Sequence, residues 1–507
     1  MQNVKEIQNS KGFESKKMIT FYFPRRYVLI ILGFLGMVSV YTMRVNLSVA
    51  LVAMVNQTTT SSSNGSLHEF VECPNLLNAG TQTESTQFKG TRYNWDSKVQ
   101  GTILGSFFYG YILTQVPGGV LAERFGGKWL FGVGTFITAV FSILTPLAAS
   151  LGTTAFIVVR VLEGIGEGVT FPAMNYLIST WAPMTERSRF STIIFTGNPF
   201  GNVIAMPISG LLSSASFLGG WPAVFYVFGG LGCIWFVFWS FLVYETPDRH
   251  PTISKEELFL IEQNNDEKLK QKPAVPWRDI FTSIPMWALV IAHTGHNFGY
   301  YLLMTEMPTY LNNILHFDLK SNGFLSAIPY IAQGAAAWVA SFIADRLRVS
   351  ETMSITSIRK LFQIIGVFGP ACCLLLINIS GCRPQLIVAL LTLGMGFNGC
   401  IYSGFNVTHV DMCPDFAGTA FAITNAVANL MGIIGPLVVG YFTATGSTIH
   451  NWSEVFYTAA AVYFVSGAIF AIFGSAEVQQ WGTATVEVKE EKNEKKLSII
   501  PDVICSH

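Results

Sequence analysis

The chain has 507 residues, of which 50% are hydrophobic and only 12% are Asp, Glu, Lys or Arg. Soluble domains carry about 25% charged residues, so this composition excludes an ordinary cytosolic enzyme, a disordered chain and a nucleic-acid binder. The 31 basic residues are balanced by 31 acidic ones, which leaves no net field to attract a polyanion. The composition predicts an all-α protein that crosses a lipid bilayer many times.

Twelve segments are long and apolar enough to be membrane spans, since a helix needs about 20 apolar residues to cross a bilayer core. We place the spans at residues 27–52, 98–121, 129–149, 154–178, 190–213, 222–244, 285–311, 323–343, 360–379, 385–408, 419–443 and 454–475. The expected organisation is an N-terminal tail (1–26), a six-helix bundle (27–244), a polar central linker (245–284), a second six-helix bundle (285–475) and a C-terminal tail (476–507).

The loops between the spans differ in basic charge. With the N-terminus inside, 24 of the 31 Lys and Arg residues fall in cytoplasmic segments and 5 on the opposite face. Because basic loops stay in the cytoplasm, both termini are predicted to be cytoplasmic. The polar segment 53–97 then lies outside, and its sequons make Asn64 and, closer to the membrane, Asn56 candidate glycosylation sites. Cys73 and Cys382 are the two cysteines expected outside, and the sequence leaves open whether they pair.

A short pattern recurs at matching places in the two halves. A small residue and three apolar residues precede Glu123-Arg124 after the second span and Asp345-Arg346 after the eighth. The small residue allows helices to approach closely, and the acid and the Arg can lock neighbouring helix ends. One copy alone would be an ordinary basic turn, but two copies in matching places predict a cytoplasmic gate.

Four charged side chains lie well inside the expected spans, and each would cost about 2.5–3.5 kcal/mol at the centre of an isolated helix. They are Arg44, Arg160, Glu163 and Glu167. At 100° per residue, Glu163 lies about 60° and Glu167 about 20° from Arg160, so these three share one stripe of the fourth span.

This stripe has two interpretations. One is a structural Arg–Glu cluster that fixes the register of the bundle. We favour the other, an anion-binding Arg with a protonatable partner, because two Glu residues beside one local Arg leave a proton to be shared or recruit Arg44. The planar fork of Arg suits carboxylate or phosphate oxygens, so the two Arg residues predict an anionic substrate.

Other spans contribute candidates that also have ordinary packing or hydrogen-bonding explanations. They lie on mixed aromatic and polar helix faces and are expected to contact the substrate together with Arg44 and Arg160: Phe108, Tyr111, His296, Tyr300, Asn406 and Asn425. No nucleophile–base set or metal-ligand pattern stands out, so we expect neither an enzyme nor a bound cofactor.

Six plus six helices with this loop pattern resemble the major facilitator superfamily, which implies two bundles that rock about a central site. Longer runs over all twelve spans are similar to the solute-carrier family of sialin, the vesicular glutamate transporters and the sodium–phosphate cotransporters. The runs include Arg44-Val-Asn-Leu-Ser-Val-Ala50, Gly105-Ser-Phe-Phe-Tyr-Gly-Tyr111 and Arg160-Val-Leu-Glu-Gly-Ile-Gly-Glu-Gly168. The resemblance implies secondary active transport of anions, with Arg44 and Arg160 at the substrate and Glu163 and Glu167 in proton coupling.

Departures from the family pattern narrow the choice of branch. Leu104 and His296 stand where vesicular glutamate transporters carry a His and an Arg, which argues against glutamate loading. The segment 292–310 is most similar to insect proteins named putative inorganic phosphate cotransporters. The N-terminal tail has no acidic dileucine signal, so a plasma membrane is favoured over an endolysosomal one.

The sequence therefore predicts a symporter that moves inorganic phosphate or an organic anion, driven by co-transported Na⁺ or H⁺. The alternative is a sialin-like, proton-coupled exporter of sialic or other carboxylic acids. A non-transporting receptor or sensor is less favoured, because a sensor has no need of two gates. The expected partners are the small anion and the lipid bilayer, with no nucleic acid, and the functional unit is expected to be a monomer.

Overall fold

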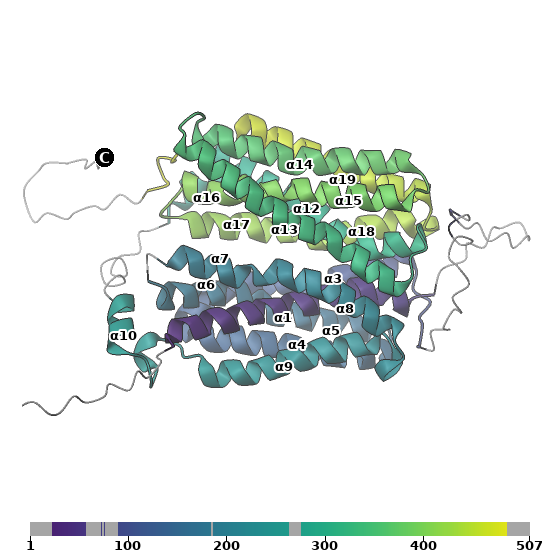
Figure 1. Ribbon diagram of the computed structural model, residues 1–507, viewed down its shortest axis with the longest axis horizontal. Coiled ribbons are helices and arrows are strands. Elements are labelled where there is room, and N and C mark those ends of the chain that lie inside the picture. Colours follow the sequence, from purple (N-terminus) through teal and green to yellow (C-terminus); the bar gives the residue numbers. More distant parts are fainter. Residues whose placement is uncertain are drawn as a thin grey trace, which may run out of the picture.

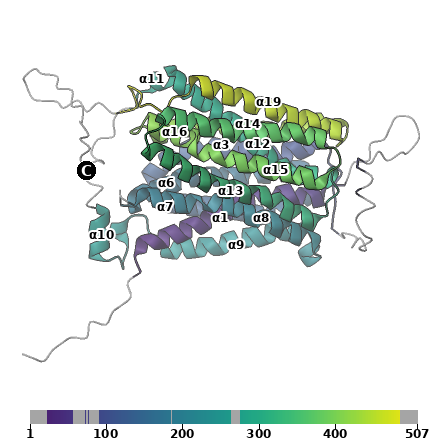
Figure 2. The same ribbon diagram turned by 45° about the horizontal axis from the view of Figure 1, so that its top comes forward.

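A computed structural model describes residues 23–56, 72–73, 76, 90–183, 186–262 and 275–483. Helices make up nearly all of the regular structure in this part of the chain, where the remaining pairing is an isolated bridge between Val55 and Tyr93. The helices run side by side in two bundles, one above the other in Figure 1, and the rotated view in Figure 2 keeps the same division. The predicted all-α class is therefore confirmed.

The first bundle, called the N-terminal half below, contains six helical stretches, two of which are broken near their middle. The breaks lie at Val169 and Thr196, where one helix ends and the next begins. The helices are α1 (Arg25–Met54), α3 (Ser97–Phe125), α4 (Gly127–Leu151), α5 (Thr153–Gly168) with α6 (Thr170–Trp181), α7 (Arg187–Phe195) with α8 (Gly197–Ser214), and α9 (Pro222–Leu242).

Short helices follow the N-terminal half: η1 (Phe217–Gly219) before α9, and η2 (Pro247–Arg249), α10 (Lys255–Glu262) and α11 (Trp277–Thr282) after it. Glu257 of α10 accepts hydrogen bonds from the backbone amides of Arg25 (2.9 Å) and Arg26 (3.0 Å). A carboxylate satisfies the free amides at a helix N-terminus, so the central linker is fastened to the first turn of α1.

The second bundle, called the C-terminal half below, also contains six helical stretches. It consists of α12 (Ile284–Asn313), α13 (Leu319–Val349), α14 (Ile355–Ser380), α15 (Pro384–Asn398) with η3 (Gly399–Ser403) and α16 (Phe405–Met412), α17 (Ala417–Asn429) with α18 (Met431–Phe442) and η4 (Thr443–Thr445), and α19 (Ile449–Phe473).

Eight of these described stretches are long and apolar enough to cross a membrane by length and composition alone. The four expected spans outside that set correspond to α3, α5–α6, α7–α8 and α12. Two of them carry buried ionisable side chains, Arg160, Glu163 and Glu167 on α5 and His293, His296 and Glu306 on α12. Such groups lower the hydropathy of a span but do not by themselves decide it, because α1 passes the same criterion although it contains the buried Arg44.

A disulfide joins Cys73 to Cys382, with the two Cα atoms 5.5 Å apart, and answers the question of pairing that the sequence leaves open. It ties the segment before α3 to the turn between α14 and α15. We call this end of the bundles, where α1 ends and α3 begins, the disulfide side, and the opposite end the termini side. Asn56 lies on the disulfide side and is exposed, with its amide donating to Asn94 at 2.8 Å; Asn64 lies outside the described residues.

The two halves pack backbone against backbone on the disulfide side. A Cβ atom on Gly101 of α3 would lie 2.3 Å from the carbonyl oxygen of Pro436 in α18, and one on Gly210 of α8 would lie 2.6 Å from a carbonyl of α13. Small residues allow such close helix crossings. On the termini side, Val116 of α3 and Trp338 of α13 are 62% and 74% exposed. The halves are therefore closed against each other on the disulfide side.

The predicted gate residues lie on the termini side. Glu123 and Arg124 end α3, Asp345 and Arg346 lie in the last turns of α13, and all four side chains are exposed. The turn after α3 is held by Glu245 instead, which follows α9 and accepts the first two backbone amides of α4 at 2.6 and 3.1 Å. The gate itself stays a prediction.

Candidate functional site

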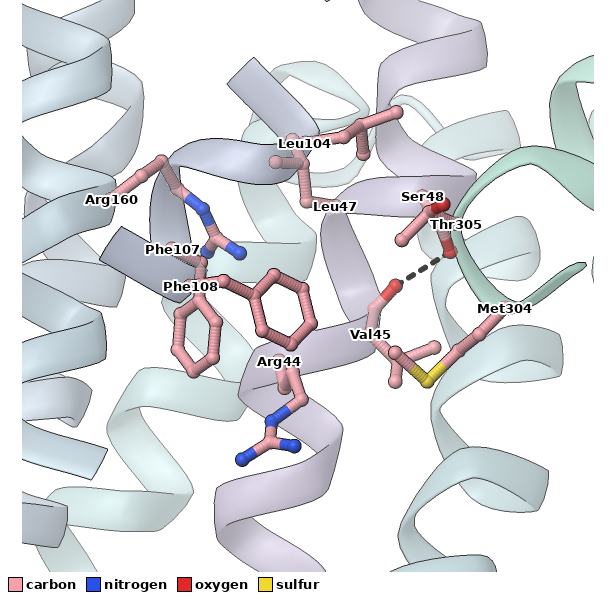
Figure 3. Close-up of a pocket in the computed structure, with 10 residues that line it drawn as sticks. All are labelled: Arg44, Val45, Leu47, Ser48, Leu104, Phe107, Phe108, Arg160, Met304 and Thr305. Carbon is pink, nitrogen blue, oxygen red and sulfur yellow. Dashed lines mark hydrogen bonds between the residues drawn. The ribbon is translucent and has the colours of Figure 1, made fainter. Parts of the chain in front are cut away.

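A small cavity lies between the two halves and is called the central cavity below (Figure 3). Its walls come from three helices of the N-terminal half and one of the C-terminal half. Its volume is close to that of a single water molecule. The lining residues are Arg44, Val45, Leu47 and Ser48 of α1, Leu104, Phe107 and Phe108 of α3, Arg160 of α5, and Met304 and Thr305 of α12.

Arg44 reaches the cavity wall from α1 and is 5% exposed. Its Nε donates to Glu167 of α5 at 2.6 Å, and the two side chains form an ion pair. Three aromatic rings surround the guanidinium, with centroids 4.6 Å (Tyr41), 5.1 Å (Phe107) and 4.7 Å (Tyr111) from its central carbon. Aromatic faces attract cations most strongly where water is excluded, so these rings help to keep the Arg44 charge buried.

Arg160 forms a second pair with Glu163, one turn along the same helix, and both side chains are at most 2% exposed. The other oxygen of Glu163 accepts a hydrogen bond from Thr145 of α4 at 2.9 Å. Both carboxylate oxygens of Glu163 therefore have partners, one charged and one neutral. The hydrogen bond from Thr145 helps to hold the Glu163 carboxylate in one orientation inside the low-dielectric interior.

The pairing differs from the simplest form of the predicted stripe. Glu167 lies on nearly the same face of α5 as Arg160, yet its carboxylate forms a hydrogen bond and an ion pair with Arg44 on α1. Arg44 is thus the partner of Glu167, which is one of the two arrangements the favoured interpretation allows, and each Arg pairs with one Glu. Glu167 Oε2 and Arg160 Nε are buried without a hydrogen-bond partner among the described residues. One carboxylate oxygen of Glu167 and one guanidinium nitrogen of Arg160 are therefore available for further hydrogen bonds.

Phe107 connects the two pairs and was missed from the sequence. Its ring centroid lies 5.1 Å from the Arg44 guanidinium carbon and 5.5 Å from that of Arg160. Figure 3 shows Phe107 and Phe108 between the two arginines. A signal was present, because Phe107 precedes the candidate Tyr111 by four residues and so lies on the same helix face.

The predicted aromatic candidates on α3 both lie at the site. Phe108 lines the central cavity and packs edge to face on Tyr301 of α12, with ring centroids 4.7 Å apart. Tyr111 is outside the set of lining residues but stacks against Phe107 at 5.8 Å and faces Arg44. The two halves therefore meet here through aromatic rings.

The candidates in the C-terminal half lie outside the lining of the central cavity. His296 contacts the Asn398 amide at 3.2 Å, and the Tyr300 hydroxyl accepts a hydrogen bond from Asn202 of α8 at 2.9 Å, which links the two halves. Asn406 and Asn425 are half-buried, and their backbone carbonyls accept hydrogen bonds from His409 at 3.2 Å and from Asn429 at 2.8 Å. The structure thus brings Arg44, Arg160 and Phe108 together and leaves these four outside the cavity lining, each with a different hydrogen-bond partner.

Sequence reasoning also missed Glu306, which lies inside the seventh expected span and is 4% exposed on α12. A carboxylate within an apolar span is itself the signal. It further missed Gln333, whose amide donates to Asn398 at 2.8 Å, and Asn429, which accepts from the Tyr301 hydroxyl at 2.7 Å. Uncharged amides give no comparable signal, because they are common at ordinary helix contacts.

Comparison with known proteins places the chain in a family. Residues 33–436 match the family model described as Major Facilitator Superfamily. Sialin of Homo sapiens is 42% identical over 456 residues, which cover 90% of each chain. A Drosophila melanogaster protein named "Putative inorganic phosphate cotransporter" is 41% identical over 463 residues (90% of this chain, 86% of the relative), and vesicular glutamate transporter 2 of Bos taurus is 37% identical over 485 residues (95% and 78%).

Solved structures agree at the level of the fold. A bacterial homologue of the human lysosomal transporter Spinster, in an inward-facing and occupied conformation, superposes with a TM-score of 0.66 at 13% identity, over 89% of this chain and 97% of the other. With identities of 36–42% over at least 90% of its length, the chain is an integral, multi-pass membrane protein of the Major Facilitator Superfamily and belongs to the transporter family of sialin, the insect phosphate cotransporter-like proteins and the vesicular glutamate transporters.

Proposed function

We propose that this protein is a secondary active transporter that moves inorganic phosphate or a small organic anion across a membrane by symport with H⁺ or Na⁺. One observation carries the proposal: Arg44 and Arg160, from two different helices, line one buried cavity between the two halves. The Arg fork bonds carboxylate or phosphate oxygens in pairs and keeps its charge at all physiological pH values. The names of two relatives, a phosphate cotransporter and a glutamate transporter, also favour an anion.

The ion pairs suggest how binding is coupled to a proton. With both Glu residues ionised, Arg44 and Arg160 are neutralised by Glu167 and Glu163. A proton on one carboxylate removes that neutralisation and leaves one positive charge free for the anion. When the anion leaves, the carboxylate loses the proton and the ion pair forms again. One proton and one anionic charge then travel together.

Alternating access follows from the size of the central cavity. The space is that of about one water molecule, which is too small for phosphate or a sialic acid. The halves are also closed on the disulfide side through the crossing of Gly101 with α18. Substrate therefore enters when the halves move apart, and the Arg–Glu pairs rearrange at the same time.

A sialin-like exporter of carboxylic acids is the second candidate. Leu104 lines the central cavity, at a place where the resemblance puts a His in vesicular glutamate transporters, and sialin of Homo sapiens is 42% identical. In this version the substrate is an organic acid and the proton gradient alone drives transport.

The proposal includes the orientation and the membrane. The excess of Lys and Arg on the termini side favours cytoplasmic termini. The Cys73–Cys382 disulfide favours an oxidising compartment for the opposite side. We assign the protein to the plasma membrane, with an endolysosomal membrane as the alternative, and to a monomer, because the central cavity is built within one chain.

Uptake into proteoliposomes tests the function. Purified protein is given labelled phosphate or labelled sialic acid under an imposed Na⁺ gradient, an imposed H⁺ gradient, or neither. Gradient-driven accumulation of phosphate supports the phosphate branch, and accumulation of sialic acid under a H⁺ gradient alone supports the sialin-like candidate. Saturable binding of either anion without flux would reject transport in favour of a receptor.

A further inference from the structure

A second cavity lies between the halves on the disulfide side and is called the Glu306 cavity below. Its polar wall combines Ser97 and Gln100 of α3 with Glu306, Thr309 and Asn313 of α12 and with Ser447, which precedes α19. It has room for little more than one water molecule. None of these six side chains lines the central cavity.

Glu306 is the unusual member of this wall. It is 4% exposed, and none of the hydrogen bonds or ion pairs of the described residues involves its carboxylate. It is also the only formally charged side chain among the described residues that line the cavity. A buried carboxylate without a counter-charge costs several kcal/mol, so an unpaired acid facing a polar cavity calls for a positively charged occupant.

The neighbouring groups offer oxygen to such an occupant. The Gln100 side-chain nitrogen donates to the Trp95 carbonyl at 2.9 Å, which leaves the Gln100 amide oxygen as an acceptor. The Ser97 hydroxyl donates to the Thr443 carbonyl at 3.1 Å, so its lone pairs are likewise available. Thr309 adds a hydroxyl from the helix turn after Glu306. The wall therefore has one full negative charge and several neutral oxygen atoms.

We propose that the Glu306 cavity is a binding site for a single Na⁺ ion. Hard cations prefer oxygen ligands, and a monovalent cation cancels the one charge of Glu306, whereas a divalent ion would leave an excess positive charge. The small volume fits one dehydrated ion. A proton would bind the carboxylate alone, and the other oxygen atoms of the wall would then coordinate nothing.

The location of the site gives the ion a role in transport. Ser97 and Gln100 belong to the N-terminal half and the other four side chains to the C-terminal half, so a bound ion draws the halves together on the disulfide side. The hydrogen bond from Ser97 to the Thr443 carbonyl already crosses this interface. In transport, Na⁺ would enter from the disulfide side and close that side behind the anion. This coupling role rests on the proposed function, whereas the ion site itself does not.

Thermal unfolding of the full-length protein in detergent tests the site without requiring flux. Tryptophan fluorescence is followed on heating in NaCl or in choline chloride at equal ionic strength. A saturable rise in Tm of about 2 °C or more in Na⁺ is expected for the unmodified protein, because a ligand that binds the folded state stabilises it. Glu306→Gln should lose the rise, and Thr309→Val should move its midpoint to higher Na⁺. Glu454→Gln, a half-buried acid on α19, should keep it.

Each outcome decides the matter. An equal rise in Tm with Na⁺ in Glu306→Gln and in the unmodified protein overturns the site. A Tm that does not respond to Na⁺, but whose pH dependence is lost in Glu306→Gln, also overturns it. If Glu306→Gln elutes as an aggregate, Thr309→Val decides alone. A Glu306-dependent Na⁺ response without uptake of any anion would reject the proposed function and keep the site; Na⁺-driven uptake that is unchanged in Glu306→Gln would do the reverse.

Discussion

The two halves of the molecule bury polar groups of different kinds. The N-terminal half buries charge, in the pairs Arg44–Glu167 and Arg160–Glu163. The C-terminal half contains a group of buried neutral side chains, called the neutral network below, in which Asn398 contacts His296 at 3.2 Å. Neutral hydrogen bonds can orient a substrate but cannot attract or release net charge, whereas an ion pair can do both when a proton arrives. If the proposed function holds, the N-terminal half handles charge and the C-terminal half can only orient the substrate.

The neutral network extends through several helices of the C-terminal half. Asn398 also accepts from Gln333 at 2.8 Å, and a second neutral group forms where Thr424 contacts both His293 (3.0 Å) and His409 (2.8 Å). Two acids of the C-terminal half lie outside this network: Asp411 pairs with Arg359 at 2.6 Å on the termini side, and Glu306 faces a cavity of its own. At the central cavity, both charged lining residues, Arg44 and Arg160, come from the N-terminal half.

The largest effect is expected from removing either buried Arg. Arg160→Ala and Arg44→Ala each remove a cation proposed to bind the anion. Losing one partner of a buried, hydrogen-bonded charge pair costs about 3 kcal/mol of binding free energy, so uptake should fall about 100-fold. Uptake is measured in proteoliposomes that contain equal amounts of folded protein. Arg383→Ala, which changes an exposed Arg on the disulfide side, is the control and should transport normally. Normal uptake in both buried variants would remove the anion site from the N-terminal half.

Neutralising one acid should separate exchange from net transport. Glu167→Gln resembles the protonated carboxylate, so Arg44 stays free to hold the anion and release becomes slow. Net uptake driven by a pH gradient should fall about 10-fold, while exchange of anion for anion persists and loses its pH dependence. Both fluxes are measured across a range of external pH, with Glu454→Gln as the control. A pH profile like that of the unmodified protein would exclude Glu167 from proton coupling.

Much of this arrangement could be predicted from the sequence, because hydropathy and charge act over short distances along the chain. The spans and the four buried charges follow from the cost of placing ionic groups in lipid. The partner of Glu167 does not follow, since helix periodicity relates residues within one helix and Arg44 is on another. The breaks at Val169 and Thr196 were missed for a similar reason: hydropathy averages over a window and is blind to local backbone geometry. The cost of placing an ionic group in lipid would have identified Glu306 in the same way as Arg44, Arg160, Glu163 and Glu167.

A smaller effect is expected from a substitution in the neutral network. Asn398→Leu leaves Gln333 and His296 without their buried partner, which costs about 1–3 kcal/mol of stability, so Tm should fall by a few degrees. Uptake should fall only several-fold, and its pH profile should keep its shape, because no charge is altered. The exposed Asn175 of α6 provides the control Asn175→Leu. A shifted pH profile in Asn398→Leu would mean that the C-terminal half also handles protons, and the division of roles would fail.

The smallest effect is expected where the two halves share one neutral hydrogen bond. Tyr300→Phe removes the hydroxyl that accepts from Asn202 at 2.9 Å, and a single neutral bond contributes about 0.5–1.5 kcal/mol. Because the bond joins α12 to α8, its loss should weaken the contact between the halves and change the rate of uptake about 2- to 5-fold, with the ion pairs and hence the pH profile intact. Tyr457→Phe, at a tyrosine that is 47% exposed, should have no effect. A loss as severe as that of Arg44→Ala would show that the C-terminal half supplies a group the anion cannot do without, and neutral side chains would then have to be counted as part of the binding site.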